Sequence, residues 1–89
     1  MNRISFTVHT FKEGEVYVAY VPELDLSSCG NSPGEARRNI EDAVRGFLGT
    51  ASEMGTLNEI LLEAGYTLEG SNWQAPEFVS LDRLSLTLS

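Results

Sequence analysis

The sequence predicts an α+β domain in which an antiparallel sheet packs against one main helix. Short segments that alternate between apolar and polar residues lie near both ends of the chain, and the longest helical pattern follows the first group. A chain of 89 residues has the length of one domain, so we expect a single domain over residues 1–89. The expected element order is β-β-β-α-α-β, with three antiparallel strands, a main helix, a second short helix and a C-terminal strand.

The first three strands are predicted from alternation and turn residues. Residues 3–11 alternate, so that one face has the apolar side chains of Ile4, Phe6 and Val8. A polar turn with a glycine follows at residues 12–15, and residues 16–21 resume β-branched and aromatic types, which predicts a hairpin. Pro22 has no N–H for a strand ladder, so the second strand ends there or becomes an edge strand, and residues 24–29 can form a short third strand.

The main helix has a clear predicted start. Ser32 suits the N-cap, Pro33 the first helical position, and Glu35 completes a capping box three residues after the cap. Apolar residues then recur at three- and four-residue spacing up to residue 51, namely Ala36, Ile40, Ala43, Val44, Phe47, Leu48 and Ala51. This stripe should lie on the sheet, with the charged residues between its members facing away.

The remaining elements are shorter. Thr56 and Glu59 repeat the capping pattern and open a second helix that Gly65 should terminate. Short runs on either side of residues 69–72 predict a small hairpin that includes Trp73.

The final residues alternate leucine with serine or threonine, which predicts a C-terminal strand. This strand either pairs inside its own sheet or joins two chains, because no lysine or proline after Arg83 protects it from pairing with another chain. The second possibility makes an oligomer interface of Leu84, Leu86 and Leu88.

Composition narrows the possible partners. The formal net charge of −7, from thirteen acidic and six basic residues, argues against binding of nucleic acid and favours a basic protein partner. The single cysteine, Cys29, cannot form an internal disulfide, which indicates a reducing compartment. The sequence has neither a signal-peptide pattern nor an apolar run long enough to span a membrane. We therefore expect a cytoplasmic protein that does not bind membranes.

The sequence offers no catalytic constellation. His9 has no ligand-like neighbour and is best interpreted as a solvated strand residue, and Cys29 has no CxxC partner. We expect no catalytic residues, no metal, no cofactor and no enzyme activity. The acidic residues are most simply solubilising charges. If some of them form a docking surface for a basic partner, the candidates are Glu23, Asp25, Glu41 and Asp42.

One stretch of the chain resembles a known family. The resemblance lies in Tyr-Val-Ala-Tyr-Val-Pro-Glu-Leu at residues 17–24, the Cys29-Gly30 end, Ser32-Pro33 with Glu35-Ala36, and the helix through Asn39-Ile40, Glu41, Asp42 and Ala43. Over roughly residues 3–52 the chain resembles the HicB-like antitoxins of type II toxin–antitoxin systems.

The resemblance implies a partial ribonuclease H-like fold of three antiparallel strands, a helix and a further strand. It also implies an antitoxin that binds a small basic HicA-type ribonuclease toxin and covers its active site, acting as a homodimer or tetramer. Longer family members append a DNA-binding domain, which we do not expect in this short, stand-alone chain. Two alternatives stay open, a stand-alone dimeric interaction domain without a toxin partner and a residual metal-dependent nuclease.

Overall fold

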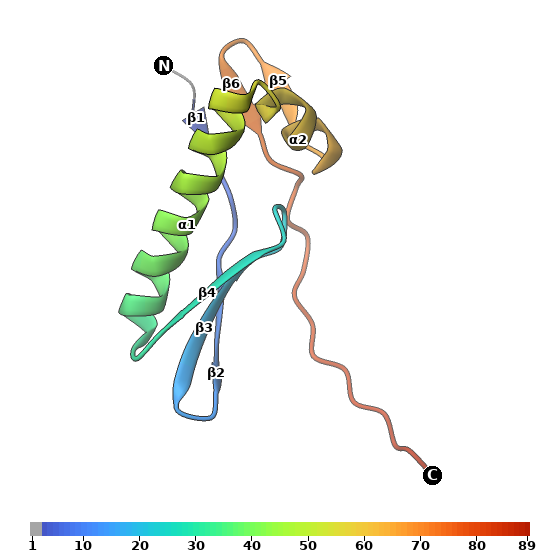
Figure 1. The fold of residues 1–89 in the computed structure, drawn as a ribbon. Coiled ribbons are helices and arrows are strands. Elements are labelled where there is room, and N and C mark those ends of the chain that lie inside the picture. The colour runs from blue at the N-terminus through green and yellow to red at the C-terminus, as the bar shows by residue number, and fades with distance from the viewer. Residues whose placement is uncertain (1–2) are drawn as a thin grey trace.

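The computed structural model describes residues 3–89, so residues 1 and 2 of the expected domain lie outside the description. Its elements, shown in Figure 1, are β1 (Arg3–Ile4), β2 (His9–Glu13), β3 (Val16–Val21), β4 (Leu26–Gly30), α1 (Pro33–Met54), α2 (Leu57–Glu63), β5 (Thr67–Glu69) and β6 (Asn72–Gln74). The strands form an antiparallel sheet in the order β2-β3-β4 and a mixed sheet in the order β1-β6-β5, in which β1 and β6 are parallel. The predicted α+β class is confirmed.

The expected first strand is broken in the middle, which corrects the prediction of one strand over residues 3–11. Residues 5–8 belong to neither β1 nor β2. The backbone N–H of Thr7 donates to the two carboxylate oxygens of Glu23 at 3.0 and 3.1 Å, and the Thr7 hydroxyl donates to Glu23 Oε2 at 2.7 Å. A side chain thus satisfies a backbone donor that a strand ladder would otherwise use. The break lets one stretch of chain serve both sheets.

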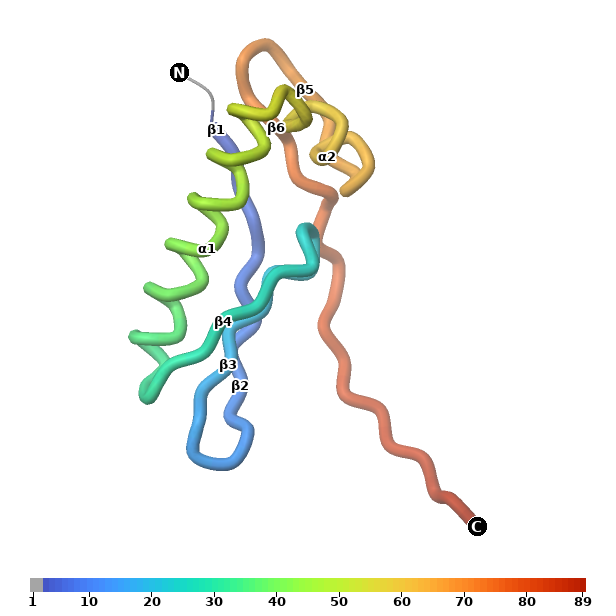
Figure 2. The backbone as a smooth tube through the Cα atoms, in the orientation of Figure 1, coloured from blue at the N-terminus to red at the C-terminus, as the bar shows by residue number. Residues whose placement is uncertain are grey.

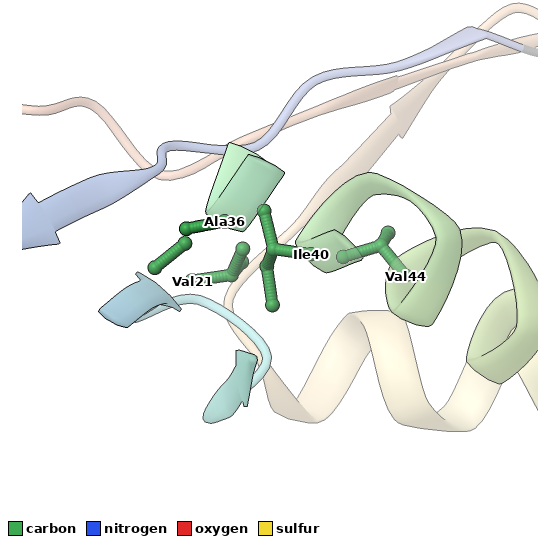
Figure 3. Packing of buried hydrophobic residues seen from close by; sticks show 5 residues of the cluster. Val21, Ala36, Ile40 and Val44 are labelled. Carbon is green, nitrogen blue, oxygen red and sulfur yellow. The ribbon is translucent and has the colours of Figure 1, made fainter. Parts of the chain in front are cut away.

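Helix α1 lies across one face of the β2-β3-β4 sheet (Figure 1). The side chains between them are buried, and Figure 3 shows them gathered between β3 and the helix. They are Ala19, Val21, Ala36, Ile40 and Val44. Phe6 and Val8 pack against this cluster from the broken first strand. The predicted apolar stripe and its orientation toward the sheet are confirmed.

The start of α1 is confirmed, with one change in the capping box. The Glu35 N–H donates to Ser32 Oγ at 3.1 Å, as expected of an N-cap serine. The Glu35 carboxylate, however, accepts from the N–H of Asn31 at 2.9 Å and not from that of Ser32. The helix continues past Ala51 to Met54 and ends at Gly55, whose φ of 75° is a left-handed conformation that favours glycine.

The second helix is confirmed, but its expected cap is wrong. Thr56 makes no capping hydrogen bond to α2, because its hydroxyl donates backward to the carbonyl oxygen of Ala51 at 3.4 Å. Gly65, with a φ of 92°, follows the helix as predicted, and the next N–H, that of Tyr66, donates to the carbonyl of Leu61 at 2.9 Å.

A second apolar cluster lies at the α2 end of the molecule. Leu61, Tyr66 and Trp73 are buried there, and the hairpin predicted around Trp73 is confirmed as β5 and β6. The Tyr66 hydroxyl donates to the backbone carbonyl of Ser5 at 2.6 Å, which ties this cluster to the broken first strand. Burial, followed by the negative charge of Glu23, raises the pKa of the Tyr66 phenol to about 12.

The expected C-terminal strand is absent from the described chain, which corrects that prediction. Residues 75–89, here called the tail, contain no strand and make no backbone–backbone hydrogen bond within the described residues. Figures 1 and 2 show the tail leaving the molecule as an extended segment. Pro76 is the second residue after β6. It has no N–H to continue a strand ladder, so the pairing of β6 does not extend into the tail. Leu84, Leu86 and Leu88 are 88%, 88% and 90% exposed.

Candidate interaction surfaces

The face of the β2-β3-β4 sheet that points away from α1 is lined with apolar residues. Side chains alternate along a strand, and Tyr17, Ala19 and Val21 of β3 pack on the α1 side. The strand register pairs His9 with Tyr20, Phe11 with Val18, and Val18 with Cys29 on the opposite side. We call this the outer face, whose main side chains are His9, Phe11, Val16, Val18, Tyr20 and Cys29, with Glu13 and Ser27 also on it. Phe11 is 44% exposed and Val16 38% exposed, so the surface is largely apolar and open to solvent.

The tail covers one corner of the outer face. The ring of His9 lies between the rings of Tyr20 and Phe78, at centroid distances of 6.4 and 6.3 Å. The Nε2 atom of His9 is buried and has no hydrogen-bond partner within the described residues. His9 is a strand residue, as predicted, but it is only partly solvated, because the tail residue Phe78 packs edge-on against it.

An open groove separates the rest of the tail from β2. It has a volume of about 670 Å³ and is lined by Val8, His9, Thr10 and Phe11 on one side and by Leu81, Asp82 and Arg83 on the other. In the β2-β3-β4 sheet, β2 is an edge strand that pairs with β3 alone. The groove thus runs beside a strand edge whose outward backbone groups are available for pairing.

Two of the four predicted contact residues lie in the turn between β3 and β4. Glu23 is half-buried, and its carboxylate accepts three hydrogen bonds from Thr7, so it has a structural role. Asp25 is exposed and accepts a hydrogen bond from the Tyr20 hydroxyl at 2.9 Å. That hydrogen bond is the main cause of a raised pKa of the Tyr20 phenol.

The other two lie on α1. Glu41 and Asp42 are exposed, and Glu41 forms a surface ion pair of 3.5 Å with Arg45. The same exposed side of the helix has Arg37 and Arg38, so positive and negative charges are mixed there. The structure therefore places the four candidates on two separate elements and does not gather them into one acidic site.

The strongest concentration of negative charge is elsewhere. No lysine or arginine occurs between Arg45 and Arg83, whereas this stretch contains exposed acidic side chains at Glu53, Glu59, Glu63, Glu69, Glu77 and Asp82. Four of them, on α1, α2 and β5, define what we call the acidic end: Glu53, Glu59, Glu63 and Glu69. Figure 1 shows α2, β5 and the C-terminal end of α1 together at one end of the molecule.

Two acids of this end oppose the helix dipole. Glu53 lies in the last turn of α1 and Glu63 in the last turn of α2, and neither turn contains a basic residue. A helix C-terminus has a partial negative charge, so these positions add to the negative potential at a cost of about 0.3–1 kcal/mol each. Such an arrangement increases the attraction for a cation or a basic protein.

Sequence reasoning missed both the outer face and the acidic end, although each has a signal in the sequence. Residues 16–21 are all apolar or aromatic, which is typical of a strand covered on both faces. The absence of basic residues between Arg45 and Arg83 can be read directly. The contact of His9 with Phe78 joins residues far apart in the chain and has no local signal.

Two further findings concern the described residues. Among residues 3–89, no group of three or more histidine, cysteine, aspartate or glutamate side chains is arranged to hold a metal ion. Within the same range, neither helix has the length and apolar character needed to cross a bilayer.

Comparisons with known protein families, with curated proteins and with solved structures found no match for this chain. The resemblance to the HicB-like antitoxins consequently stays a prediction from the residues that suggested it.

Proposed function

We propose that this protein is a HicB-like antitoxin that acts in the cytoplasm by binding a small basic HicA-type ribonuclease and covering its active site. In this proposal the protein has no catalytic activity of its own. The observation that supports it most strongly is the acidic end, where Glu53, Glu59, Glu63 and Glu69 are exposed and lack basic neighbours in the sequence. Complementary charge of this kind accelerates encounter with a basic partner.

The strand arrangement supports the fold that the resemblance implies. The antiparallel sheet β2-β3-β4 is followed by α1, and β6 then pairs in parallel with β1. Because β1 and β2 are two parts of one broken strand, the order β4-β3-β2/β1-β6 places the last strand beside the first. We propose on this basis a partial ribonuclease H-like arrangement in which the parallel crossover is made through α1 and α2.

Neutralisation would depend on occlusion, since a protein that covers an RNA-binding surface competes with RNA for it. A ribonuclease needs lysine and arginine side chains to hold phosphates. Acidic side chains at the edge of the complex can engage those same groups. The acidic end supplies such side chains on two helices and a strand, whose ordered backbones lose little conformational freedom on binding.

The test is an RNA-cleavage assay with a purified HicA-type toxin, preferably one encoded beside this protein. We expect cleavage to stop when one chain of this protein is present per toxin, together with a stable complex in size-exclusion chromatography. Continued cleavage at a tenfold excess, with no complex, would overturn the proposal. That result would favour the stand-alone interaction domain.

A matched pair of variants locates the docking surface. Glu59→Lys with Glu63→Lys reverses two charges of the acidic end, and Glu41→Lys with Asp42→Lys reverses two charges on α1. Both pairs change the net charge equally, so a difference between them reports position. We expect the first pair to slow association at least about tenfold and the second to have a smaller effect. Equal effects would exclude the acidic end as the specific docking surface.

Ionic strength gives an independent check. The association rate should fall between low and physiological salt while the dissociation rate changes little, because long-range attraction is screened and short-range contacts are not. An association rate that does not depend on salt would remove electrostatic steering from the mechanism.

A further inference from the structure

We propose that the tail of each chain forms a β-strand on the free edge of β2 in a second copy, so that two chains exchange their C-terminal segments and form a homodimer. This inference does not depend on the toxin-binding proposal. It concerns a different surface, at the edge of β2 and away from the α2 end of the molecule.

The tail has the pattern of a strand but no strand partner in its own chain. Residues 84–89 alternate leucine with hydroxyl side chains, and the leucines are almost fully exposed. The exposed large apolar side chains of the tail are Phe78, Val79, Leu81, Leu84, Leu86 and Leu88. Single exposed leucines are common, but Leu84, Leu86 and Leu88 lie on one side of an extended segment, and such a row indicates an interaction surface.

The free edge of β2 is a suitable acceptor. Its five residues extend over about 17 Å, and the six residues 84–89 extend over about 20 Å when fully extended. In the β2-β3-β4 sheet, the outward edge of β2 has no partner strand among the described residues. A strand added there would place a row of leucines beside Phe11 at the border of the outer face.

The position of the tail explains why this pairing should occur between chains. Leu81, Asp82 and Arg83 already lie across the groove from residues 8–11. Residues 84–89 therefore lie past most of β2 in their own chain, and Figure 2 shows this segment directed away from the molecule. A second copy offers the same edge, with the open groove of about 670 Å³ beside it to admit a strand.

Charge favours a second copy over a basic partner at this site. Residues 84–89 contain no charged side chain, so they offer nothing that a basic surface would recognise. They also introduce no repulsion between two chains that each have a net charge of −7. A reciprocal exchange makes the same contact twice and closes the assembly.

The contact between Phe78 and His9 gives this interface a starting point. It places the beginning of the tail on the outer face of its own chain, so that the following residues continue from an apolar surface that is already partly covered. The outer face and the exchanged tails would then form one continuous apolar interface in the dimer.

The first measurement is the mass of the full chain in solution, compared with a variant that ends at Arg83. We expect a dimer for the full chain at micromolar concentration and a monomer for the shortened chain. Loss of three buried leucines should weaken dimerisation at least about 100-fold. Leu86→Lys should have the same direction of effect, and circular dichroism should show that both variants stay folded. A monomeric full chain, or a shortened chain that stays dimeric, would overturn the proposal.

Crosslinking then tests which surfaces meet. In a Cys29→Ser background, one chain carries Phe11→Cys and a differently tagged chain carries Leu86→Cys, and the two are refolded together and treated with a short bis-maleimide. We expect a crosslink between the two tags. The control replaces Phe11→Cys with Glu59→Cys at the acidic end, which should give no crosslink. A crosslink equally strong in the control would contradict the exchange. So would a second experiment in which one chain bears both Phe11→Cys and Leu86→Cys and crosslinks only within itself.

Discussion

The first strand and the tail have the same kind of sequence pattern and opposite outcomes. In residues 3–8 the alternating side chains of Ile4, Phe6 and Val8 pack against the two apolar clusters. In the tail, Leu84, Leu86 and Leu88 remain almost fully exposed. Period-2 alternation thus specifies an extended segment with one apolar face, but the partner of that face depends on which surfaces lie within reach.

The largest effect that tests this comparison is expected from truncating one side chain in each region. Ile40 is fully buried between α1 and the sheet, so Ile40→Ala should lower the free energy of unfolding by about 2–5 kcal/mol. Leu86→Ala should change it by less than about 0.5 kcal/mol when the chain is monomeric. Urea unfolding at low protein concentration, followed by circular dichroism, measures both.

The concentration dependence of Leu86→Ala is the control for that pair. At higher concentration the variant should become less stable than the parent chain, because dimerisation stabilises the folded state by mass action. If Leu86→Ala were as destabilising as Ile40→Ala even at low concentration, the tail would belong to the folded body of its own chain, and the comparison would fail.

A smaller effect is expected where β4 meets α1. A Cβ atom on Gly30 would lie 2.6 Å from the backbone nitrogen of Ala36, so the strand end and the first turn of the helix can approach only at a glycine. Gly30→Ala should therefore cost about 1–3 kcal/mol of unfolding free energy, measured by thermal or urea unfolding.

Gly46→Ala is the matched control for this substitution. Gly46 lies in the exposed part of α1 and a Cβ there would meet nothing within 4 Å, so alanine should stabilise the helix by about 0.5–1 kcal/mol. Opposite signs for the two stability changes would show that the cost of Gly30→Ala comes from the close approach of β4 and α1, and not from a general property of glycine. Equal signs would contradict the crowding at Gly30.

Local interactions explain which parts of the fold the sequence predicts well. The start of α1 depends on Ser32, Pro33 and Glu35, which are neighbours, and the turn before β3 depends on residues 12–15. The break in the first strand depends instead on Thr7 and Glu23, which are sixteen positions apart. The Thr56 hydroxyl donates to the Ala51 carbonyl and does not cap α2, contrary to the prediction. Such choices between equally plausible partners require the packed structure.

The candidate site shows the same division. Charge alone suggested Glu23, but its half-buried carboxylate accepts hydrogen bonds from Thr7, which no count of acidic residues could reveal. The acidic end could have been found from the sequence, because the lack of basic residues after Arg45 needs no structure. The partner of residues 84–89 could not be assigned from the sequence, and among the described residues of the same chain they pair with no strand.

A further effect of modest size concerns Tyr66, whose hydroxyl connects the second apolar cluster to Ser5. Tyr66→Phe removes this hydrogen bond and should cost about 1 kcal/mol at neutral pH.

The pKa of the Tyr66 phenol is about 12 in the folded chain, above its ordinary value of 10.0. The folded state therefore holds this proton more tightly than the unfolded state does, so its contribution is complete below pH 10 and is lost as the pH rises toward 12. Urea unfolding at pH 8 and pH 11 should show a steeper loss of stability in the parent chain than in Tyr66→Phe, with Tyr17→Phe as the control that leaves this link intact. Equal losses in the parent chain and Tyr66→Phe would mean that the phenol is not what anchors the broken first strand to the second cluster, and the tail would then differ from the body only in its apolar contacts.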